Sequence, residues 1–181
     1  MDKTSLYLGV DGGGTKTLAV CGDERGRILG AGLEGLSNYQ VVGLGTALST
    51  LEAVVDKTLE KAGAGRQGLK KLLFALSGAD LPADFAEIAE ALKKTFAGYS
   101  FELVNDSWAA FRAGSDASFG AVAVCGTGTN SAARGREGQE KALRSLGYEW
   151  GNWGGSADLA REALHRAFRS EELTGPKTRL E

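Results

Sequence analysis

The sequence predicts an α/β protein in which a β-β-β-α-β-α-β-α unit is followed by the beginning of a second, similar unit. Short apolar runs bounded by turn residues alternate with stretches of helical periodicity. The chain is rich in turn-forming residues, with 27 Gly against 2 Pro. A turn made of Gly and Thr follows an apolar run twice, near residues 12 and 126. This repetition indicates two related units.

The first unit begins with three predicted strands, residues 5–10, 16–22 and 27–33. The turns between them are residues 12–14, which are all Gly, and the polar stretch 23–26. Turns this short join neighbouring strands only in an antiparallel arrangement. We therefore expect an antiparallel three-stranded start.

Helices and strands then alternate up to about residue 115. Leu44, Leu48, Leu51, Val55 and Leu59 recur every three or four positions, which predicts a helix that ends at Gly63. The apolar run 70–77 predicts a buried strand, and Pro82 begins a helix with an apolar stripe from Phe85 to Phe96. A strand over 99–104 and a short helix over 107–113 complete the unit.

A small, polar stretch, 114–118, predicts the boundary between domains at 1–115 and 119–181. In the second domain we expect strands at 119–125 and 130–134, a charged turn at 136–141 and a loop rich in Trp and Gly at 147–155. The final helix is expected from Ser156 to about Arg169. This pattern predicts one hairpin and one helix without further strands, as in a domain that is cut short.

Composition excludes several classes of protein. The net charge of −2 provides no basic surface for nucleic acid. No apolar run has the length of a membrane span, and the first residues lack a secretory signal. Cys21 and Cys125 lie in apolar runs and are expected to be buried, reduced thiols. We expect a cytoplasmic protein that binds neither nucleic acid nor membrane.

The first motif with chemical content follows the first strand. Asp11 ends this strand, and the residues after it are Gly12, Gly13, Gly14, Thr15 and Lys16. Glycines expose backbone N–H groups to a phosphate because no Cβ stands in the way. Asp11 suits Mg²⁺ held through water, since magnesium keeps several waters of its own. The alternative is a glycine-rich hairpin without a ligand.

A second loop of the same kind opens the second unit, with Gly126, Thr127, Gly128 and Thr129 between two strands. Two such loops can face one another across a cleft and hold a polyphosphate. The alternative is two unrelated hairpin turns, which the shared pattern disfavours.

The third motif is Asn105-Asp106, at the end of a buried strand and before a helix. A carboxylate at this end of an open α/β sheet points into the cleft where ligands bind. There it can accept the proton of an attacking hydroxyl, which makes Asp106 the candidate catalytic residue. Taken alone, Asp106 fits the N-cap of the next helix equally well.

Together these motifs resemble the actin-like ATPase and sugar kinase superfamily. More narrowly, they look like its N-acetylglucosamine kinase branch, which is grouped with the BadF/BadG/BcrA/BcrD-type ATPases. The resemblance covers most of the chain and includes the segments 35–38 (Gly-Leu-Ser-Asn) and 76–80 (Leu-Ser-Gly-Ala-Asp). It implies a ribonuclease H-like (actin-like ATPase) fold for the first domain.

The resemblance also implies roles for individual residues. Asp106 would be the base that takes the proton from the sugar 6-hydroxyl. Asp11 would hold Mg²⁺ and ATP, and both glycine-containing loops would contact the phosphates. The residues implied to bind the sugar are Asn38, Ser77, Asn105, Asp106, Thr127, Gly128 and Asn152.

Two departures from the family pattern leave alternatives open. The family's Gly-Asp-Glu-Gly-Ser segment corresponds here to 150–156 (Trp-Gly-Asn-Trp-Gly-Gly-Ser), which lacks the acidic pair that helps to hold the sugar. Trp150 and Trp153 could instead stack on another ring or acyl group, or simply pack within the loop. The family's second domain also continues beyond residue 181. We therefore expect a truncated form, which forms a homodimer or pairs with the missing C-terminal segment.

The function that follows is an ATP-dependent sugar kinase acting on N-acetylglucosamine or a related amino sugar. One alternative is an ATPase that activates a radical dehydratase, in which cysteines of two subunits hold an iron–sulfur cluster. Another is a remnant without activity that binds a sugar or nucleotide.

Overall fold

The computed structural model describes residues 5–180 of the chain. The chain divides into two compact units, which we call unit 1 (Met1–Asp116) and unit 2 (Ala117–Glu181). Each unit has its own β-sheet, and each is described by itself below.

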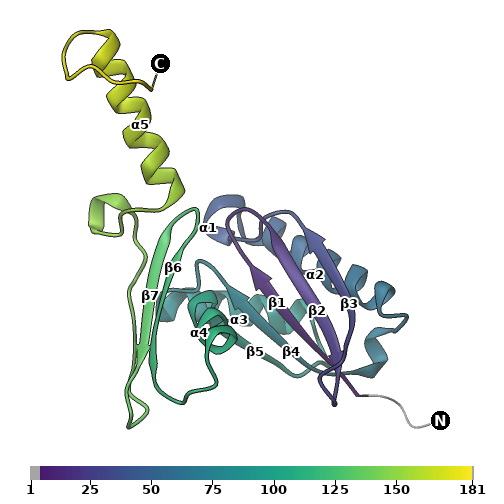
Figure 1. Cartoon of the computed structure of the whole chain (residues 1–181). Helices are drawn as coiled ribbons and strands as arrows, with labels where there is room; N and C mark the ends of the chain where they lie inside the picture. The colour runs from purple at the N-terminus through teal and green to yellow at the C-terminus, as the bar shows by residue number, and fades with distance from the viewer. Residues whose placement is uncertain (1–4, 181) are drawn as a thin grey trace. The chain divides into compact units, whose positions relative to one another are not determined.

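Unit 1 is built on a five-stranded sheet with the strand order β3-β2-β1-β4-β5 (Figure 1). Its strands β1, β2 and β3 are antiparallel neighbours, whereas β4 runs parallel to both β1 and β5. The antiparallel start predicted from the short turns is thus confirmed. The strands are β1 (Leu6–Gly12), β2 (Thr17–Asp23), β3 (Ile28–Glu34), β4 (Leu69–Leu76) and β5 (Phe101–Asn105).

The helices of unit 1 follow the predicted order, with one addition. They are α1 (Tyr39–Val42), α2 (Leu44–Lys61), α3 (Pro82–Thr95) and α4 (Asp106–Gly114), and a 3₁₀ turn, η1 (Arg66–Gly68), precedes β4. The four-residue helix α1 was not predicted, because it is too short to show a periodic pattern. Gly43, with φ of 79°, ends α1 and directly precedes α2.

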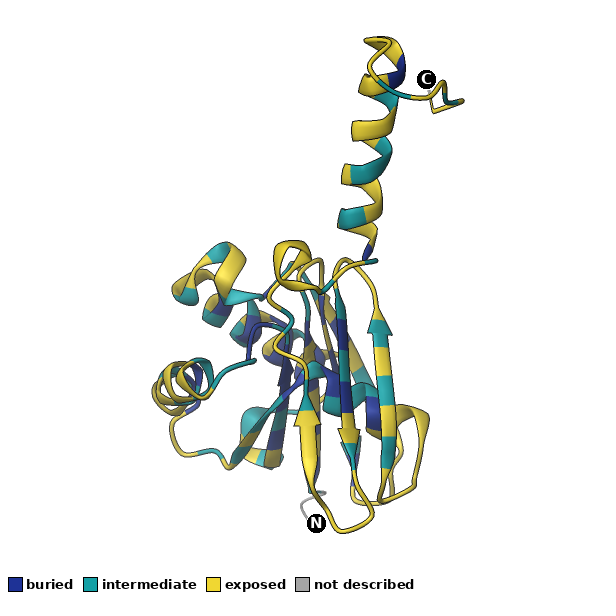
Figure 2. Ribbon diagram, turned by 90° about the vertical axis from the view of Figure 1, so that its left-hand side faces the viewer, coloured by how far each residue is buried: buried dark blue, intermediate teal, exposed yellow. Residues whose placement is uncertain are grey.

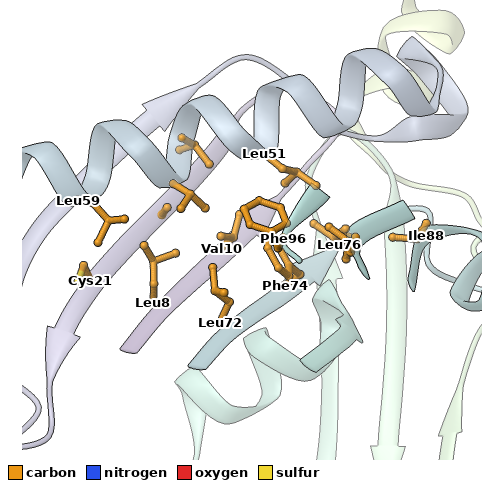
Figure 3. Close-up of a cluster of buried hydrophobic side chains, with 14 of the residues drawn as sticks. Leu8, Val10, Cys21, Leu51, Leu59, Leu72, Phe74, Leu76, Ile88 and Phe96 are labelled. Atoms are coloured by element: carbon orange, nitrogen blue, oxygen red, sulfur yellow. The ribbon is translucent and has the colours of Figure 1, made fainter. Parts of the chain in front are cut away.

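The hydrophobic core of unit 1 lies between α2 and one face of the sheet (Figure 3). Residues of β1 are alternately buried and exposed, so that Leu8 and Val10 face the core. Phe74 of β4 packs against Phe96, with ring centroids 5.0 Å apart. Burying a side chain of this size stabilises the fold by roughly 1.5–3 kcal/mol. This packing holds β1, β4 and β5 in fixed register.

Unit 2 contains an antiparallel sheet with the order β6-β7-β8 and a long helix, α5. Figure 2 shows that α5 is largely exposed. Its elements are β6 (Gly120–Cys125), β7 (Thr129–Arg134), β8 (Glu140–Ala142), the 3₁₀ turn η2 (Tyr148–Trp150) and α5 (Ser156–Glu171).

The expectation of no strand beyond the hairpin of unit 2 was wrong. The additional strand, β8, pairs Ala132 with Ala142 and Arg134 with Glu140. It consists of Glu-Lys-Ala, which carries no apolar alternation, and the pairing is set by the turn in which Gly135 N donates to Gln139 O. Unit 2 therefore begins with three antiparallel strands followed by a helix, the same order as unit 1.

The two cysteines differ in burial, so the expectation of two buried thiols was wrong for one of them. Cys21 is fully buried in the core of unit 1, and burial raises the pKa of its thiol. Cys125, the last residue of β6, is exposed because the alternation along this strand turns it to the open face. Among the described residues, no helix combines the length and the apolar composition needed to cross a membrane.

Candidate functional site

Three parallel strands of unit 1 end at the same level and gather the candidate residues there. In the sheet register, Gly12 of β1 lies beside Leu76 of β4, and Leu76 lies beside Asn105 of β5. The residues that follow, Gly13, Ser77 and Asp106, therefore leave the sheet side by side. We call this region the carboxyl end of the sheet, the place where open α/β sheets bind their ligands.

The first glycine loop is anchored to the protein through its carbonyl groups. Gly12 O accepts a hydrogen bond from Ser77 N at 2.8 Å, and Gly13 O accepts one from Ser37 N at 3.1 Å. Gly13 N donates to Lys16 O at 3.0 Å and closes the turn. The loop is thus held in one conformation by the segments that follow β3 and β4.

Two glycines of this loop differ in what surrounds them. A Cβ on Gly12 would lie 2.5 Å from Leu76 Cδ2 and 2.6 Å from Ser37 Oγ, so close packing requires Gly12. A Cβ on Gly14 would meet no atom within 4 Å. Gly14, Thr15 and Lys16 are all exposed. The open side of the loop is therefore able to receive a phosphate group.

Asp106 is the first residue of α4, and it does not cap this helix. The N-cap is Asn105, whose Oδ1 accepts a hydrogen bond from Ser107 N at 3.0 Å. The alternative interpretation of Asp106 as the N-cap was therefore wrong. Burial, and then the charge of Asp11, raise the pKa of Asp106. Its carboxylate consequently binds a proton more readily than a solvated one.

Asn105 is buried, and both ends of its amide contact the protein. Its Nδ2 donates to Ala79 O at 3.1 Å and to Asp80 Oδ1 at 2.9 Å, while its Oδ1 caps α4. Contact with the sugar, which the family resemblance implied for Asn105, stays a prediction. Its observed contacts are those of a residue that supports the start of α4.

Asn38 and Ser77 lie on two loops that touch each other. Asn38 caps α1 by accepting a hydrogen bond from Gln40 N, and Gln40 Nε2 donates to Gly78 O at 3.3 Å. Gly78 has φ of 86°, and a Cβ on it would lie 3.0 Å from Asn38 Oδ1. The Oγ of Ser77 is buried, with no hydrogen-bond partner among the described residues. A ligand hydroxyl at this place would satisfy it.

Asp80, in the loop after β4, and Asp84, at the start of α3, were given no role in the sequence analysis, although Asp80 belongs to the segment 76–80 quoted there. Asp84 accepts hydrogen bonds from Tyr39 Oη at 2.6 Å and from Leu81 N at 2.7 Å. This bond to Asp84, together with burial, raises the pKa of Tyr39 to about 12. Burial, followed by the charges of Asp106 and Asp84, raises the pKa of Asp80 to about 6. The sequence signals for Asp80 were its position soon after a buried strand and its place in the segment 76–80.

The second glycine loop, in unit 2, is anchored in the same way as the first. Gly126 N donates to Gly128 O at 2.9 Å, and the loop carbonyls Gly126 O and Thr127 O accept from Ser156 N and Ala157 N of α5. A Cβ on Gly155 would lie 2.5 Å from Thr127 O. The first residues of α5 therefore fix this loop, and Gly126, Thr127 and Gly128 are exposed.

The Trp-rich loop of unit 2 is shaped by Asn152, whose Oδ1 accepts a hydrogen bond from Leu146 N at 3.1 Å. The side chains of Trp150 and Trp153 are 74% and 55% exposed. The structure therefore gives little support to packing within the loop as the reason for these two tryptophans.

The candidate residues fall into two groups. Asp11, the first glycine loop, Asn38, Ser77, Asn105 and Asp106 gather at the carboxyl end of the unit 1 sheet. Gly126, Thr127, Gly128, Thr129 and Asn152 belong to unit 2. Within residues 5–180, no group of three or more His, Cys, Asp or Glu residues is arranged to hold a metal ion.

Comparison with known proteins identifies a family. The sequence profile of the BadF/BadG/BcrA/BcrD ATPase family matches residues 8–179. The chain is 26% identical to an N-acetyl-D-glucosamine kinase of Dictyostelium discoideum, over 97% of this chain and 58% of that protein. It is also 26% identical to an N-acetylmuramic acid/N-acetylglucosamine kinase of Clostridium acetobutylicum, over 96% of this chain and 57% of that protein.

The fold is shared with a solved structure, an N-acetylglucosamine kinase candidate from Chromobacterium violaceum. The TM-score is 0.83 at 19% identity, over 98% of this chain and 62% of that one. This similarity confirms the predicted fold class. The chain spans less than two thirds of the length of each of these three proteins.

Proposed function

Because the chain belongs to the BadF/BadG/BcrA/BcrD ATPase family, we propose that it is the nucleotide- and sugar-binding part of an ATP-dependent sugar kinase. The substrate is N-acetylglucosamine or a related amino sugar, and the phosphoryl group goes to its 6-hydroxyl. Both curated relatives, which match nearly the whole of this chain, are kinases of N-acetylated amino sugars.

One observation carries the proposal: the sheet register brings Gly13, Ser77 and Asp106 out side by side. An anchored glycine loop, a buried hydroxyl without a partner and a carboxylate with a raised pKa thus meet at one end of the sheet. Phosphoryl transfer to a sugar needs these parts, namely a phosphate cradle, a sugar contact and a base.

In the proposed reaction, the sugar 6-oxygen attacks the γ-phosphorus of ATP. A new P–O bond forms to the sugar while the bond from the γ-phosphorus to the bridging oxygen breaks, so that ADP leaves. Asp106 accepts the proton of the hydroxyl, and its raised pKa suits that task. Asn38 and Ser77 orient the sugar. Asn105 holds the start of α4 by accepting a hydrogen bond from Ser107 N.

We assign the phosphate contacts to the exposed residues of the first glycine loop, Gly14, Thr15 and Lys16. Gly12 and Gly13 shape this loop, because Gly12 is buried and Gly13 N already donates to Lys16 O. Asp11 holds Mg²⁺ through bound water, because magnesium in kinases is held chiefly by substrate phosphates and few carboxylates. The metal offsets negative charge on the phosphates. In unit 2, Gly126, Thr127, Gly128 and Thr129 form a second phosphate-binding loop, and Thr127, Gly128 and Asn152 contribute to sugar binding.

The sugar arm of the proposal is tested by calorimetry on the full chain with N-acetylglucosamine, N-acetylmuramic acid, glucosamine and glucose. We expect saturable binding of an N-acetylated sugar that Asp106→Asn weakens about tenfold or more, since a hydrogen bond to a charged group is lost. Glu102→Gln is the matched control, because Glu102 lies on β5, the strand that leads to Asp106, in an exposed pair with Lys71. A chain that is folded but binds none of these sugars contradicts the proposal.

The nucleotide arm compares two glycines of one loop. Gly14→Ala meets no neighbouring atom and should leave stability unchanged while weakening binding of Mg²⁺–ATP. Gly12→Ala clashes with Leu76 and Ser37 and should lower stability by about 1–3 kcal/mol. Calorimetric titration with ATP and urea unfolding measure the two effects. Unchanged ATP affinity in Gly14→Ala would remove the first loop from the nucleotide site.

The dehydratase activator is the less supported function. Its cluster needs accessible thiolates, whereas Cys21 is enclosed in the core of unit 1. Iron analysis of the purified chain separates the two functions, because only the activator holds iron.

A further inference from the structure

Asp80 lies in the loop between β4 and α3, and it contacts the segment that carries Asp106. Its Oδ1 accepts a hydrogen bond from Asn105 Nδ2 at 2.9 Å. Its backbone N donates to Asp84 Oδ2 at 3.2 Å, which attaches the loop to the first turn of α3. The backbone of Asp80 is therefore held by the first turn of α3, and its carboxylate is bonded to Asn105.

Asn105 connects Asp80 to the first turn of α4. Its side-chain amide is planar, so the bond from Nδ2 to Asp80 also fixes the direction of Oδ1, which caps α4 at Ser107 N. Asp106 stands between the cap and Ser107, as the first residue of α4. A change in the orientation of Asn105 therefore changes the direction in which Asp106 leaves the backbone.

The groups around this network are mostly acidic. Asp80 faces Asp106 of α4 and Asp84 of α3, and Asp106 in turn faces Asp11 of β1. From α1, Tyr39 donates to Asp84. Among the described residues, the amide of Asn105 donates a hydrogen bond to the carboxylate of Asp80. A half-buried carboxylate among other acids depends on its hydrogen bonds, so the bond from Asn105 Nδ2 is the contact that holds the Asp80 side chain in place.

We propose that Asp80 is a positioning residue for Asp106: through Asn105 it sets the first turn of α4 so that the Asp106 carboxylate meets the sugar hydroxyl. This role rests on the proposed sugar kinase function. It assigns a task to the acidic residue of the segment 76–80, which the phosphate and sugar contacts leave unused.

Two substitutions separate the hydrogen bond of Asp80 from its charge. Asp80→Asn keeps an acceptor oxygen for Asn105 and removes the charge, whereas Asp80→Ala removes both. If Asp80 acts by positioning, Asp80→Ala weakens binding of the sugar about tenfold or more, and Asp80→Asn keeps it within about threefold. Asp23→Asn is the control, since Asp23 is a buried, hydrogen-bonded aspartate at the opposite end of the same sheet.

A double-mutant cycle tests whether Asp80 acts through Asn105. Asn105→Ser keeps a residue that caps helices well but lacks the donor for Asp80. We expect Asp80→Ala to add little to the loss of sugar affinity already caused by Asn105→Ser. Additive losses in the double variant, or full affinity in Asp80→Ala, would overturn the inference and leave the kinase proposal standing.

Failure of the kinase proposal itself has a different signature, namely a wild-type chain that binds none of the four sugars. The positioning role is then decided by NMR, from the amide exchange of Ser107. We expect faster exchange at Ser107 in Asp80→Ala and wild-type exchange in Asp80→Asn. Wild-type exchange at Ser107 in Asp80→Ala, measured at a temperature at which this variant is folded, would overturn the inference.

Discussion

At the scale of single residues, several partly buried carboxylates lie close together at the carboxyl end of the unit 1 sheet. Asp80 and Asp106 both have raised pKa values, for which burial is the first cause and neighbouring carboxylates the second. Such a cluster carries unfavourable charge in the absence of a cation or a proton. This tension is typical of sites that bind a metal-bound nucleotide or move a proton.

The raised pKa of Asp80 has a consequence for stability that can be measured. The folded chain holds this proton up to about pH 6, whereas the unfolded chain releases it near its ordinary value of 3.8. The stabilisation is therefore fully present below about pH 4 and is lost as pH rises through 6. Relative to Asp80→Asn, the free energy of unfolding of the wild type should fall by on the order of 1 kcal/mol between pH 4 and 7, because partial exposure of Asp80 reduces the effect.

Urea unfolding of both proteins at several pH values measures this difference. Asp23→Asn should show the opposite slope. Although burial raises the pKa of Asp23, hydrogen bonds from Arg27 and Arg25 outweigh it, and the net pKa is lowered. A stability difference between wild type and Asp80→Asn that does not vary with pH would mean that neither burial nor the neighbouring carboxylates raise the pKa of Asp80.

Sequence reasoning located the carboxylates that directly follow the ends of predicted strands, Asp11 and Asp106, because a buried apolar run marks where a strand ends. Asp80 lies four residues beyond β4. Its importance depends on Asn105, which is 25 positions away in sequence. A pair so distant in sequence becomes visible only when the parallel register of β4 and β5 is known.

At the scale of elements, both glycine loops are fixed by carbonyl groups that accept hydrogen bonds from a following segment. In unit 1 the donors are Ser37 N and Ser77 N, and in unit 2 they are Ser156 N and Ala157 N. Within each loop an N–H group closes the turn, from Gly13 to Lys16 O and from Gly126 to Gly128 O. The recurrence of this arrangement supports the interpretation of the two loops as related elements.

Gly155 is the most constrained position of the second loop. A Cβ there would lie 2.5 Å from Thr127 O and 2.6 Å from Gly128 Cα, so Gly155→Ala must displace the loop or the start of α5. We expect a loss of about 1–3 kcal/mol in the stability of unit 2, measured as faster hydrogen exchange of the amides of β6 and β7. Gly126→Ala is the control, since its Cβ would meet no atom within 4 Å. Equal stability of the two variants would contradict this packing.

Elements with a strong period were predicted well, and short ones were not. The stripe from Leu48 to Leu59 predicted α2, which buries Leu51 and Leu59 as expected. Helix α1 and strand β8 have four and three residues, and their conformations depend on a cap at Asn38 and on pairing with β7. Patterns of side-chain polarity carry no information about segments this short.

At the scale of the whole molecule, the two units differ in how much apolar surface they bury. The described core cluster, from Leu6 to Phe96, lies entirely in unit 1. In the described part of unit 2, Ala132 is the one apolar residue that is buried. Small units with little buried apolar area are marginally stable.

We therefore expect the units to open at different free energies. Amide protons of β1 and β4 should exchange with solvent about 100-fold more slowly than those of β6 and β7, or slower still. Hydrogen exchange followed by mass spectrometry on the full chain measures both sets together. Equal protection in the two sheets would mean that unit 2 gains stability from contacts beyond its own core, for example in the predicted homodimer.

The different burial of the two cysteines allows one of them to be labelled selectively. A thiol-reactive fluorophore should modify Cys125, which is exposed, and spare Cys21, which is enclosed in the core. Cys125 directly precedes Gly126, and its Sγ lies 3.5 Å from Gly154 O. A dye at this position would sit beside the second loop without any engineered cysteine, and its emission would report the arrival of a nucleotide there.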